Sequence, residues 1–445
     1  MKIQPEDVTE KSDKFEAHLV MEGLLVGAVG GIVVVAYRFC LEHAESWMQE
    51  IVQAAKGNAL YMAGWFLVLV ILAILVARII TWEPYAASTG VPQLEAEHLG
   101  KIHPNWWRVL IAKFSSGVLC TFGGLALGRC SPSVQLGAMA GKGVSKALKR
   151  DEDEEEILRT CGASAGMAAI FHAPLAGAIY GLEQIHKSFT MIAFLPALAA
   201  SVAADFLVAV FLGTDTIFQL GTVNPFPVQY YGLLLLMGII LGLVAVFYDW
   251  IVLKVKALFD SAKKVPTTIK VMIPFLCAGV LGFIHPTLLG GGHGLITELT
   301  TGDVLISFML VVIIVRILFF AISFGSSAPG GIFFPLLVLG AYIGGIFVSV
   351  VIEYLGLDPM CFDTFVVLAM GGFFSAVARA PLTGMVLMLE LTGSINQLLP
   401  LAFISLVAFV VASILEPTPL SNNLRDQLIK KEEQKAKEKE TQAGS

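Results

Sequence analysis

Apolar residues fill long runs of this 445-residue chain, and polar residues are confined to the shorter segments between them. The runs at residues 61–80, 231–247 and 398–415 have close to the roughly 20 residues that a helix needs to cross a bilayer. Together the runs predict about ten membrane helices, several of them short, broken or fused where glycine and proline interrupt them. Such breaks persist in a membrane only where the freed backbone groups face protein or a water-filled cavity.

The chain contains one short sequence twice, in corresponding places of its two halves. Residues 173–177 read APLAG and residues 380–384 read APLTG, and a carboxylate in apolar sequence follows nine residues after each proline, at Glu183 and Glu390. Duplicated apolar halves interrupted by glycine and proline are typical of proteins that pass small solutes through a bilayer, with the site where the halves meet. The sequence therefore predicts a duplicated membrane protein with a solute pathway.

Polar segments divide the chain into five parts. A polar and charged N-terminal segment precedes the first membrane repeat, a loop rich in Thr, Asp, Asn and Pro joins the repeats, and a charged tail follows the second. The predicted boundaries are 1–17, 18–213, 214–227, 228–424 and 425–445. The tail has the composition of a solvated helix or a disordered segment.

Composition excludes several classes of function. The chain is 56% hydrophobic and 14% charged, whereas soluble domains carry about 25% charged residues. Its net charge of −6 argues against nucleic acid as a partner. The six cysteines lack metal-type spacing, and His172 and His293 have no companion ligands nearby in sequence, so we predict no metal site and no cofactor.

Four breaks rich in glycine and proline each precede an apolar, helix-compatible run. They lie at residues 88–92, 128–132, 290–294 and 325–335. Glycine allows a sharp turn and proline suits a first helical turn, so each break predicts a helix start with unpaired N–H groups. Several helix N-termini aimed at one buried point bind an anion without a full cation, and partial charges also release it. The breaks therefore predict a buried anion site.

These four breaks, in this order, resemble the CLC family of chloride channels and chloride/proton antiporters. Residues 88–92 (STGVP) resemble the family's GSGIP, residues 128–132 (GRCSP) resemble GREGP, and residues 331–335 (GIFFP) resemble GIFxP. The APLTG at 380–384 fits as well, and the resemblance extends over about residues 60–425. It implies an all-α polytopic membrane protein with two inverted-topology repeats and broken, re-entrant helices. It also implies a homodimer with one pore per subunit, in the plasma or inner membrane, with both termini cytoplasmic.

The resemblance implies chloride as the substrate, and it assigns the anion site residue by residue. The Thr89 hydroxyl matches the family's serine, and Ile332 and Phe333 would offer backbone N–H groups. The full set of anion-binding positions comprises Thr89, Gly90, Arg129, Cys130, Ser131, Ile332, Phe333 and Ser421. We expect Arg129, together with Lys113, Arg316 and Arg379, to pair with backbone carbonyls or carboxylates. Glu183 and Glu390 are expected to pair with such cations.

Three gate-equivalent positions depart from the family pattern. Cys130 stands where the family has its gating glutamate, Gln184 where its antiporters have a second proton-carrying glutamate, and Ser421 where the family has an inner tyrosine. A gating carboxylate would repel chloride by about 4 kcal/mol at about 4 Å and an effective dielectric near 20. Glutamine cannot exchange protons near neutral pH. These losses predict a passive, proton-uncoupled chloride channel or uniporter.

Three alternatives remain open. A chloride/proton antiporter could use a non-standard relay through Cys130 or His186, because imidazole titrates near neutrality and a thiol at a helix N-terminus can ionise. A non-conducting relative is disfavoured by the intact anion-site motifs. An enzyme is suggested only by GASAG at 162–166, which matches the Gly-x-Ser-x-Gly pattern around a serine nucleophile. That pattern requires a preceding strand, and Ser164 lies in a helical apolar run, so we expect no enzyme.

Overall fold

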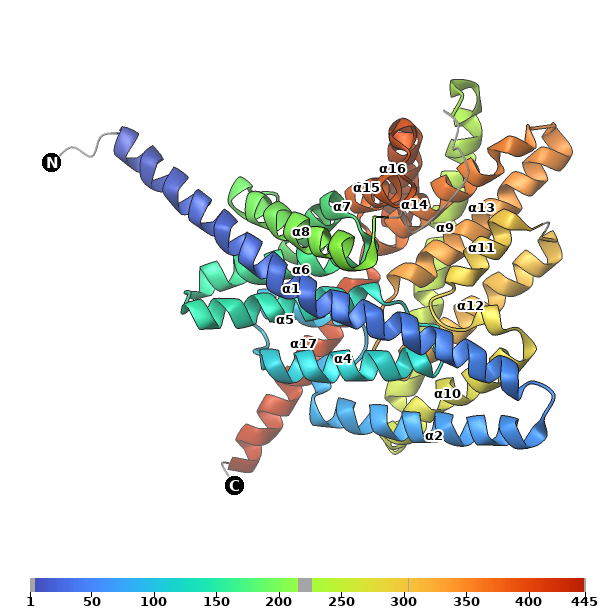
Figure 1. The fold of residues 1–445 in the computed structure, drawn as a ribbon, viewed down its shortest axis with the longest axis horizontal. Coiled ribbons are helices and arrows are strands. Elements are labelled where there is room, and N and C mark those ends of the chain that lie inside the picture. Colours follow the sequence, from blue (N-terminus) through green and yellow to red (C-terminus); the bar gives the residue numbers. More distant parts are fainter. Residues whose placement is uncertain (1–4, 215–225, 303, 444–445) are drawn as a thin grey trace.

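The computed structural model describes residues 5–214, 226–302 and 304–443, with side chains from residue 17 to residue 438. Helices form the whole of this architecture apart from one isolated backbone bridge between Gly128 and Gly331 (Figure 1). Nine helical segments of the described chain are long and apolar enough to cross a membrane. The all-α polytopic membrane fold predicted from the sequence is therefore confirmed.

The helix order repeats after the eighth helix. The first half contains α1 (Pro5–Ala55), α2 (Ala59–Trp82), α3 (Val91–His98), α4 (Trp106–Phe122), α5 (Cys130–Leu148), α6 (Glu152–Phe171), α7 (Pro174–Tyr180) and α8 (Met191–Leu212). The second half contains α9 (Tyr231–Ser261), α10 (Thr267–Ile284), α11 (His293–Thr301), α12 (Ile306–Gly325), α13 (Phe333–Leu355), α14 (Phe362–Ala378), α15 (Pro381–Thr392) and α16 (Leu398–Leu415). A final helix, α17 (Leu420–Ala443), follows both halves.

Short helical turns complete the chain. One is a π-helical turn, η2 (Gly181–His186), which continues directly from α7. The others are 3-10 turns, η1 (Pro84–Ala86), η3 (Val228–Tyr230), η4 (Pro286–Leu288), η5 (Pro359–Cys361) and η6 (Ile395–Gln397). Repeated prolines mark equivalent helix starts, because proline is compatible with the first turn of a helix. Pro174 opens α7 and Pro381 opens α15, which is the correspondence that the duplicated sequence predicts.

Equivalent helices pack in equivalent pairs. In the first half α5 packs on α6 and α1 on α8, and in the second half α13 packs on α14 and α9 on α16. Close approach of α5 and α6 depends on glycine, since a Cβ added at Gly137 would lie 2.1 Å from the Gly162 carbonyl oxygen. The halves meet where α7 contacts α15. Ser164 lies inside α6, so the GASAG sequence is a helix-packing segment rather than a strand-to-helix turn.

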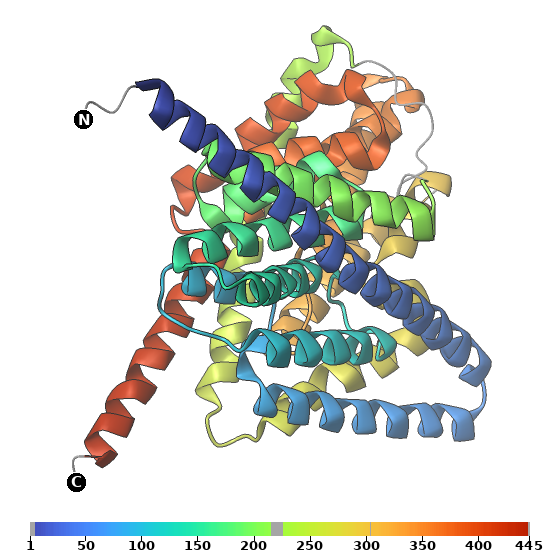
Figure 2. The same cartoon turned by 60° about the vertical axis from the view of Figure 1, so that its left-hand side comes forward.

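Two of the predicted segment boundaries fall inside helices. Helix α1 begins at Pro5, inside the predicted N-terminal segment 1–17, and α17 begins at Leu420, before the predicted tail at 425. Most of the predicted loop 214–227 lies outside the described residues. Helices α1 and α17 project from the body in both views (Figures 1 and 2).

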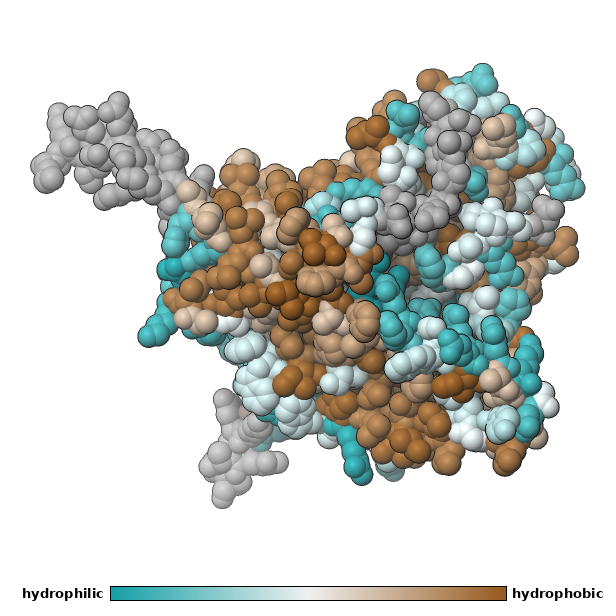
Figure 3. Space-filling view, in the orientation of Figure 1, coloured by the Kyte–Doolittle hydropathy of each residue, from teal (hydrophilic) through white to brown (hydrophobic). Residues whose placement is uncertain are grey.

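Apolar side chains cover much of the outer surface. Figure 3 shows hydrophobic residues over α8 and over α2, where Phe206, Phe211 and Leu67 are exposed. Burying such side chains normally stabilises a soluble protein by about 1.5–3 kcal/mol each, so leaving them outside is consistent with an apolar solvent. The chain is a multi-pass membrane protein, and many of its polar side chains are buried between the helices.

Candidate functional site

Three of the four sequence breaks meet at a backbone junction between the two repeats. Ser88 N donates to Ser327 O at 3.1 Å, and Gly330 N donates to Ser88 O at 3.2 Å. Gly128 and Gly331 exchange two backbone hydrogen bonds, at 2.7 and 2.6 Å. The loops that precede α3, α5 and α13 are thereby joined, and the starts of these helices are brought to one buried place.

The loop before α3 is fixed from behind by a buried cation. Lys113 Nζ, on α4, donates to Ala86 O at 2.9 Å and to Ser88 O at 2.7 Å. The expected pairing of this lysine with backbone carbonyls is therefore confirmed. Gly90 has φ +95°, and an added Cβ would lie 2.3 Å from Gln135 Oε1, so the turn into α3 requires glycine.

The residues predicted to bind the anion are buried around this junction. Thr89 is 2% exposed, Phe333 is 3% exposed, and Cys130 and Ser131 are inaccessible to solvent. Ser131 Oγ has no hydrogen-bond partner among the described residues. N–H groups in a first helical turn also lack partners within their own helix. The arrangement presents hydroxyls and helix N-termini, which suits a small monovalent anion.

Arg129 lies at the same junction, but its side chain faces elsewhere. Its guanidinium is 3.9 Å from Glu42 and lies over the Phe334 ring at 5.7 Å. It lines a cavity of about 520 Å³ that Arg38, Glu42, Glu45, His172 and His293 also line. The contribution of Arg129 to the junction is therefore its backbone, as the residue that precedes α5.

The fourth break, residues 290–294, is separate from the junction. Gly290 N donates to Gly124 O at 3.1 Å. Arg316 holds the segment through bonds of 2.7–2.9 Å to the carbonyls of Leu288, Gly290 and Gly291. Four breaks were predicted to converge on one anion site, and the backbone hydrogen bonds join only three of them.

Cys130 opens α5 and contacts sulfur. Its Sγ lies 3.1 Å from Met167 Sδ of α6, and no charged or hydroxyl group of the described residues is at hydrogen-bond distance from it. This environment supplies nothing that would stabilise a thiolate beyond the helix N-terminus itself. The neighbourhood therefore favours the thiol as a packing group over the gating thiolate considered from the sequence.

Gln184 acts as a hydrogen-bond donor. Its Nε2 lies 3.1 Å from Ala378 O and 3.4 Å from Arg379 O, at the end of α14, and the residue is 4% exposed. Arg379 has φ +54°, so α14 ends in a left-handed residue whose neighbouring carbonyls need a donor. An ionised glutamate has no proton to give to these carbonyls, whereas an amide has two. The glutamine therefore matches its surroundings.

Tyr180 is a site residue that the sequence analysis missed. Its side chain is fully buried, and its hydroxyl has no hydrogen-bond partner in the described part of the chain. Its ring packs edge-on against the Phe333 ring, with centroids 5.3 Å apart. It precedes Gln184 by one helical turn. A lone tyrosine in an apolar helix gives no sequence signal, because most such tyrosines pack in cores.

Ser421 is engaged with a buried carboxylate. Its hydroxyl donates to Glu95 Oε1 at 2.5 Å, and Glu95 is 2% exposed. Lys187 and Arg425 lie 3.4 and 3.6 Å from the same carboxylate. Glu95 thus links the start of α17 to α3 and to the residue after η2. The Ser421 hydroxyl contributes to this link in the structure.

Glu183 and Glu390 each cap a helix of the opposite repeat. Glu183 accepts hydrogen bonds from Leu382 N, Thr383 N and Thr383 Oγ1 at 2.7–3.2 Å, at the start of α15. Glu390 accepts from Leu175 N and Ala176 N at 2.9 and 2.8 Å, at the start of α7. The expected scaffold role is confirmed, but the expected cation partners are wrong. Backbone N–H groups at a helix N-terminus supply the positive charge instead.

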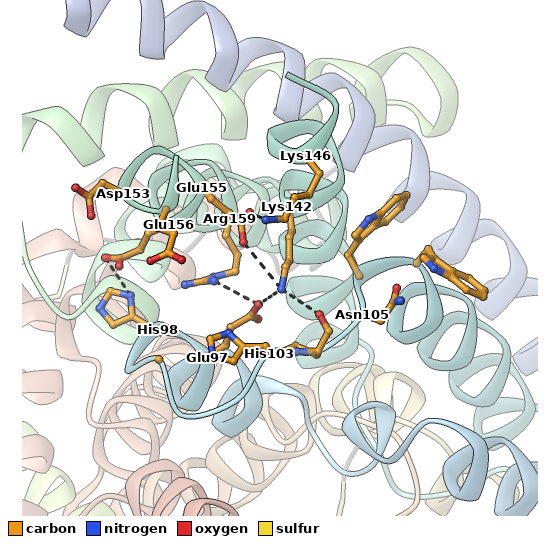
Figure 4. A pocket seen from close by; sticks show the side chains of 15 residues that line it. Glu97, His98, His103, Asn105, Lys142, Lys146, Asp153, Glu155, Glu156 and Arg159 are labelled. Atoms are coloured by element: carbon orange, nitrogen blue, oxygen red, sulfur yellow. Dashed lines mark hydrogen bonds and ion pairs between the residues drawn. The ribbon is translucent and has the colours of Figure 1, made fainter. Parts of the chain in front are cut away.

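His186, the other residue of the proposed relay, lies in a cluster near Gln184. Its Nδ1 is 3.5 Å from Glu156 Oε1, and His98 Nδ1 is 3.3 Å from the same oxygen. Burial lowers the pKa of His98 and of His186 below the ordinary value for imidazole. A cavity of about 630 Å³ reaches His98 and Glu156, with Glu97, Lys142 and Arg159 paired in its wall (Figure 4).

Comparison with known proteins gives relatives over nearly the whole chain. The chain is 31% identical over 421 residues to the H(+)/Cl(−) exchange transporter ClcA of Vibrio cholerae serotype O1, which covers 92% of this chain and 89% of that protein. It is 32% identical over 451 residues to the H(+)/Cl(−) exchange transporter ClcA of Salmonella arizonae, with 97% and 93% covered.

Solved structures share the fold. A slow cyanobacterial Cl−/H+ antiporter superposes with a TM-score of 0.87 at 25% identity and covers 93% of this chain and 98% of its own. A CLC-type fluoride/proton antiporter superposes with a TM-score of 0.76 at 19% identity, covering 93% of this chain and 98% of its own. The second likeness concerns the fold alone.

These relatives contradict the passive, proton-uncoupled channel or uniporter predicted from the sequence. The relatives are named as H(+)/Cl(−) exchange transporters, and the first solved neighbour is a Cl−/H+ antiporter. The prediction treated the absence of carboxylates at positions 130 and 184 as the absence of any proton route. That step was too strong, because hydroxyls and imidazoles also transfer protons.

The sequence profile of one family covers most of the chain. The profile described as Voltage gated chloride channel matches residues 71–413, which contain all three joined breaks and both APL segments. Members of this family are transporters or channels, and chloride is the transported substrate. The match, the relatives and the shared fold lead to one conclusion: the chain belongs to the voltage gated chloride channel (CLC) family.

Proposed function

We propose that this protein exchanges chloride for protons across a membrane. The observation that carries the proposal is the relationship, over more than nine tenths of the chain, to proteins named H(+)/Cl(−) exchange transporters. The junction of three helix starts between the repeats supports it, because it offers a chloride ion buried hydroxyls and N–H groups. Chloride occupies the junction, and protons take a route beside it.

Chloride is held by the residues at the starts of α3, α5 and α13. Thr89 and Ser131 provide hydroxyls, and the backbone around Gly90, Cys130, Ile332 and Phe333 provides N–H groups. Partial charges of this kind bind an anion and let it leave, whereas a buried lysine would hold it more tightly. Lys113 does not contact the anion itself but fixes the loop that carries Thr89, by donating to the Ser88 carbonyl.

The proton route has three candidate residues. Cys130 and His186 were named from the sequence, and Tyr180 joins them because its buried hydroxyl lacks a partner among the described residues. Glu183 is excluded from this set, because its carboxylate accepts three hydrogen bonds from α15. The three candidates differ in place, with Cys130 at the anion junction, Tyr180 beside Phe333, and His186 next to Glu156.

The proposed oligomeric state, membrane and orientation follow those expected from the sequence. The protein acts as a homodimer in the plasma or inner membrane, with lipid around its apolar faces and with both termini in the cytoplasm. It has no enzymatic activity. Light scattering of the detergent-solubilised protein tests the dimer, since a mass corresponding to one chain of 47.7 kDa would contradict it.

Paired ion measurements test the exchange. The protein is reconstituted in chloride-loaded liposomes, and a chloride electrode and a pH electrode record the same sample. We expect chloride efflux to drive proton uptake in a fixed ratio, and a proton gradient to drive chloride against its own gradient. Chloride efflux without proton movement would overturn the proposal.

Single variants identify the relay once exchange is observed. Cys130→Ala, Tyr180→Phe and His186→Gln are each compared with the unaltered protein for chloride rate and for proton rate. A relay residue is one whose loss reduces the proton rate while chloride still moves. Loss of both rates together indicates damage to the anion pathway instead.

A further inference from the structure

Three side chains from separate segments bring metal-ligating atoms together outside the anion junction. His98 is the last residue of α3, Glu156 lies in the first turns of α6, and His186 is the last residue of η2. Their ligand atoms all lie within 4.8 Å of one another. The planes of the two imidazole rings make an angle of 67°, and their centroids are 5.3 Å apart. We call these three residues the histidine–glutamate cluster.

Hydrogen bonding does not account for the cluster. Glu156 Oε1 is 3.3 Å from His98 Nδ1 and 3.5 Å from His186 Nδ1, both beyond the usual 2.7–3.2 Å for N–H···O bonds. Both Nδ1 atoms are buried, and neither has a hydrogen-bond partner within the described residues. Buried polar nitrogens without partners are uncommon, and a bound water or metal ion would satisfy them. Two such nitrogens converge here on one carboxylate oxygen.

The spacing fits a tetrahedral metal ion. Zinc binds histidine nitrogen at about 2.0–2.1 Å and carboxylate oxygen at similar distances, which places neighbouring ligand atoms about 3.3–3.4 Å apart. The two edges from Glu156 to the imidazoles, 3.3 and 3.5 Å, are close to this length, and the two imidazole nitrogens lie within 4.8 Å of each other. Two imidazoles and one carboxylate are a ligand set that suits zinc and related divalent metals.

We propose that His98, Glu156 and His186 form a binding site for Zn²⁺ or a similar divalent transition metal, with the fourth position open to water. No metal site was predicted from the cysteine spacing or from His172 and His293, and the three cluster residues lie in three segments with no ligand spacing among them. Folding alone brings them together. The proposal does not depend on proton coupling.

The surroundings allow a cation to reach the site. The cavity of about 630 Å³ leads to His98 and Glu156, and Glu152, Asp153 and Glu155 also line it (Figure 4). Two cations lie close enough to oppose binding, but each is paired. Arg159 lies 3.3 Å from Glu97, and Lys187 lies 3.4 Å from Glu95. Their charges are thus largely balanced before a metal ion arrives.

A bound metal would tie the anion loop to the segment that carries Gln184. Helix α3 has eight residues and runs from the Gly90 turn to His98, so its far end lies at the cluster. The turn η2 contains both Gln184 and His186. Joining these elements to α6 restrains the loop that carries Thr89, so the metal should slow chloride efflux.

Zinc titration of the full-length protein tests the site. Calorimetry in detergent, on protein freed of affinity tag and metal, should show one zinc ion bound per chain. His98→Gln and His186→Gln should each weaken binding by roughly tenfold or more. His103→Gln is the matched control, because His103 lines the same cavity but is not part of the cluster. It should bind zinc like the unaltered protein.

X-ray absorption and flux measurements make the result decisive. Absorption at the zinc edge should show two imidazole nitrogens in the unaltered protein and fewer in either cluster variant. Zinc on both sides of the liposome should slow chloride efflux in the unaltered protein and in His103→Gln, but not in His98→Gln. Retained zinc-free chloride efflux shows that a variant is folded, and Glu156→Gln replaces any variant that fails this check. Binding that is absent, or unchanged in the cluster variants, would overturn the proposal.

Discussion

The reciprocal caps made by Glu183 and Glu390 allow a quantitative comparison of the two repeats. Glu183 accepts two partly shielded bonds, from Thr383 N and Thr383 Oγ1, and Glu390 accepts one, from Ala176 N. Each cap has one further bond from an exposed leucine, which water largely replaces. A hydrogen bond to a charged group contributes about 1.5–3 kcal/mol. Glu183→Ala should therefore destabilise by about 3–6 kcal/mol, and Glu390→Ala by about half as much.

Thermal unfolding in detergent, followed by circular dichroism, shows which of the two substitutions destabilises the protein more. We expect the midpoint to fall more for Glu183→Ala than for Glu390→Ala. Thr383 offers the matched control, because Ala176 is its equivalent in the first repeat. In a Thr383→Ala background the two caps have the same bonds, so both glutamate substitutions should have equal effects. Equal effects in the unaltered background would refute the reasoning, and so would a larger effect of Glu390→Ala.

Three further substitutions test the site itself. Thr89→Val removes a buried hydroxyl at constant volume and should weaken chloride binding about tenfold in calorimetry, whereas Thr89→Ser should not. Lys113→Met leaves the carbonyls of Ala86 and Ser88 without their donor, so the unfolding midpoint and chloride affinity should both fall, and unchanged values would contradict its positioning role. Tyr180→Phe keeps the ring that packs on Phe333, so chloride efflux should persist while the proton rate drops several-fold; an unaltered ratio of the two rates would remove Tyr180 from the proton route.

Local sequence predicted the fold well where local chemistry determines it. Glycine and proline at residues 88–92, 128–132 and 331–335 mark helix starts whatever surrounds them, and the structure has α3, α5 and α13 beginning there. The duplication was readable because Pro174 and Pro381 must both lie in first turns. Helix starts and their repetition are thus properties of short segments.

Partners from distant segments were not predictable in the same way. The carboxylates of Glu183 and Glu390 were recognised as structural, but their partners depend on how α7 and α15 face each other across the repeats. The histidine–glutamate cluster draws on three segments and shares no spacing rule. Tyr180 becomes notable only because its hydroxyl is buried without a partner in the described chain. Each of these features requires the tertiary arrangement.

The error about coupling has a specific physical origin. Two absent carboxylates, at Cys130 and Gln184, were taken as the loss of proton exchange. In the structure Gln184 replaces a possible acid with a donor that holds the carbonyls at the end of α14. Its presence is explained by hydrogen bonding, so it carries no information on whether protons pass nearby. A structural reason for a substitution weakens the functional inference drawn from it.

The hydrogen bonds of the buried carboxylates also bear on the proposed proton route. Besides Glu156, three carboxylates lie near the proposed route, and each already has hydrogen-bond or ion-pair partners. Glu183 and Glu390 cap helix starts, and Glu95 accepts from Ser421 while facing Lys187 and Arg425. Protonating any of them would weaken hydrogen bonds that join the repeats or fix α17. The Tyr180 hydroxyl and the His186 Nδ1 are buried without a hydrogen-bond partner in the described part of the chain, so the proposed proton route is tested first at these two residues.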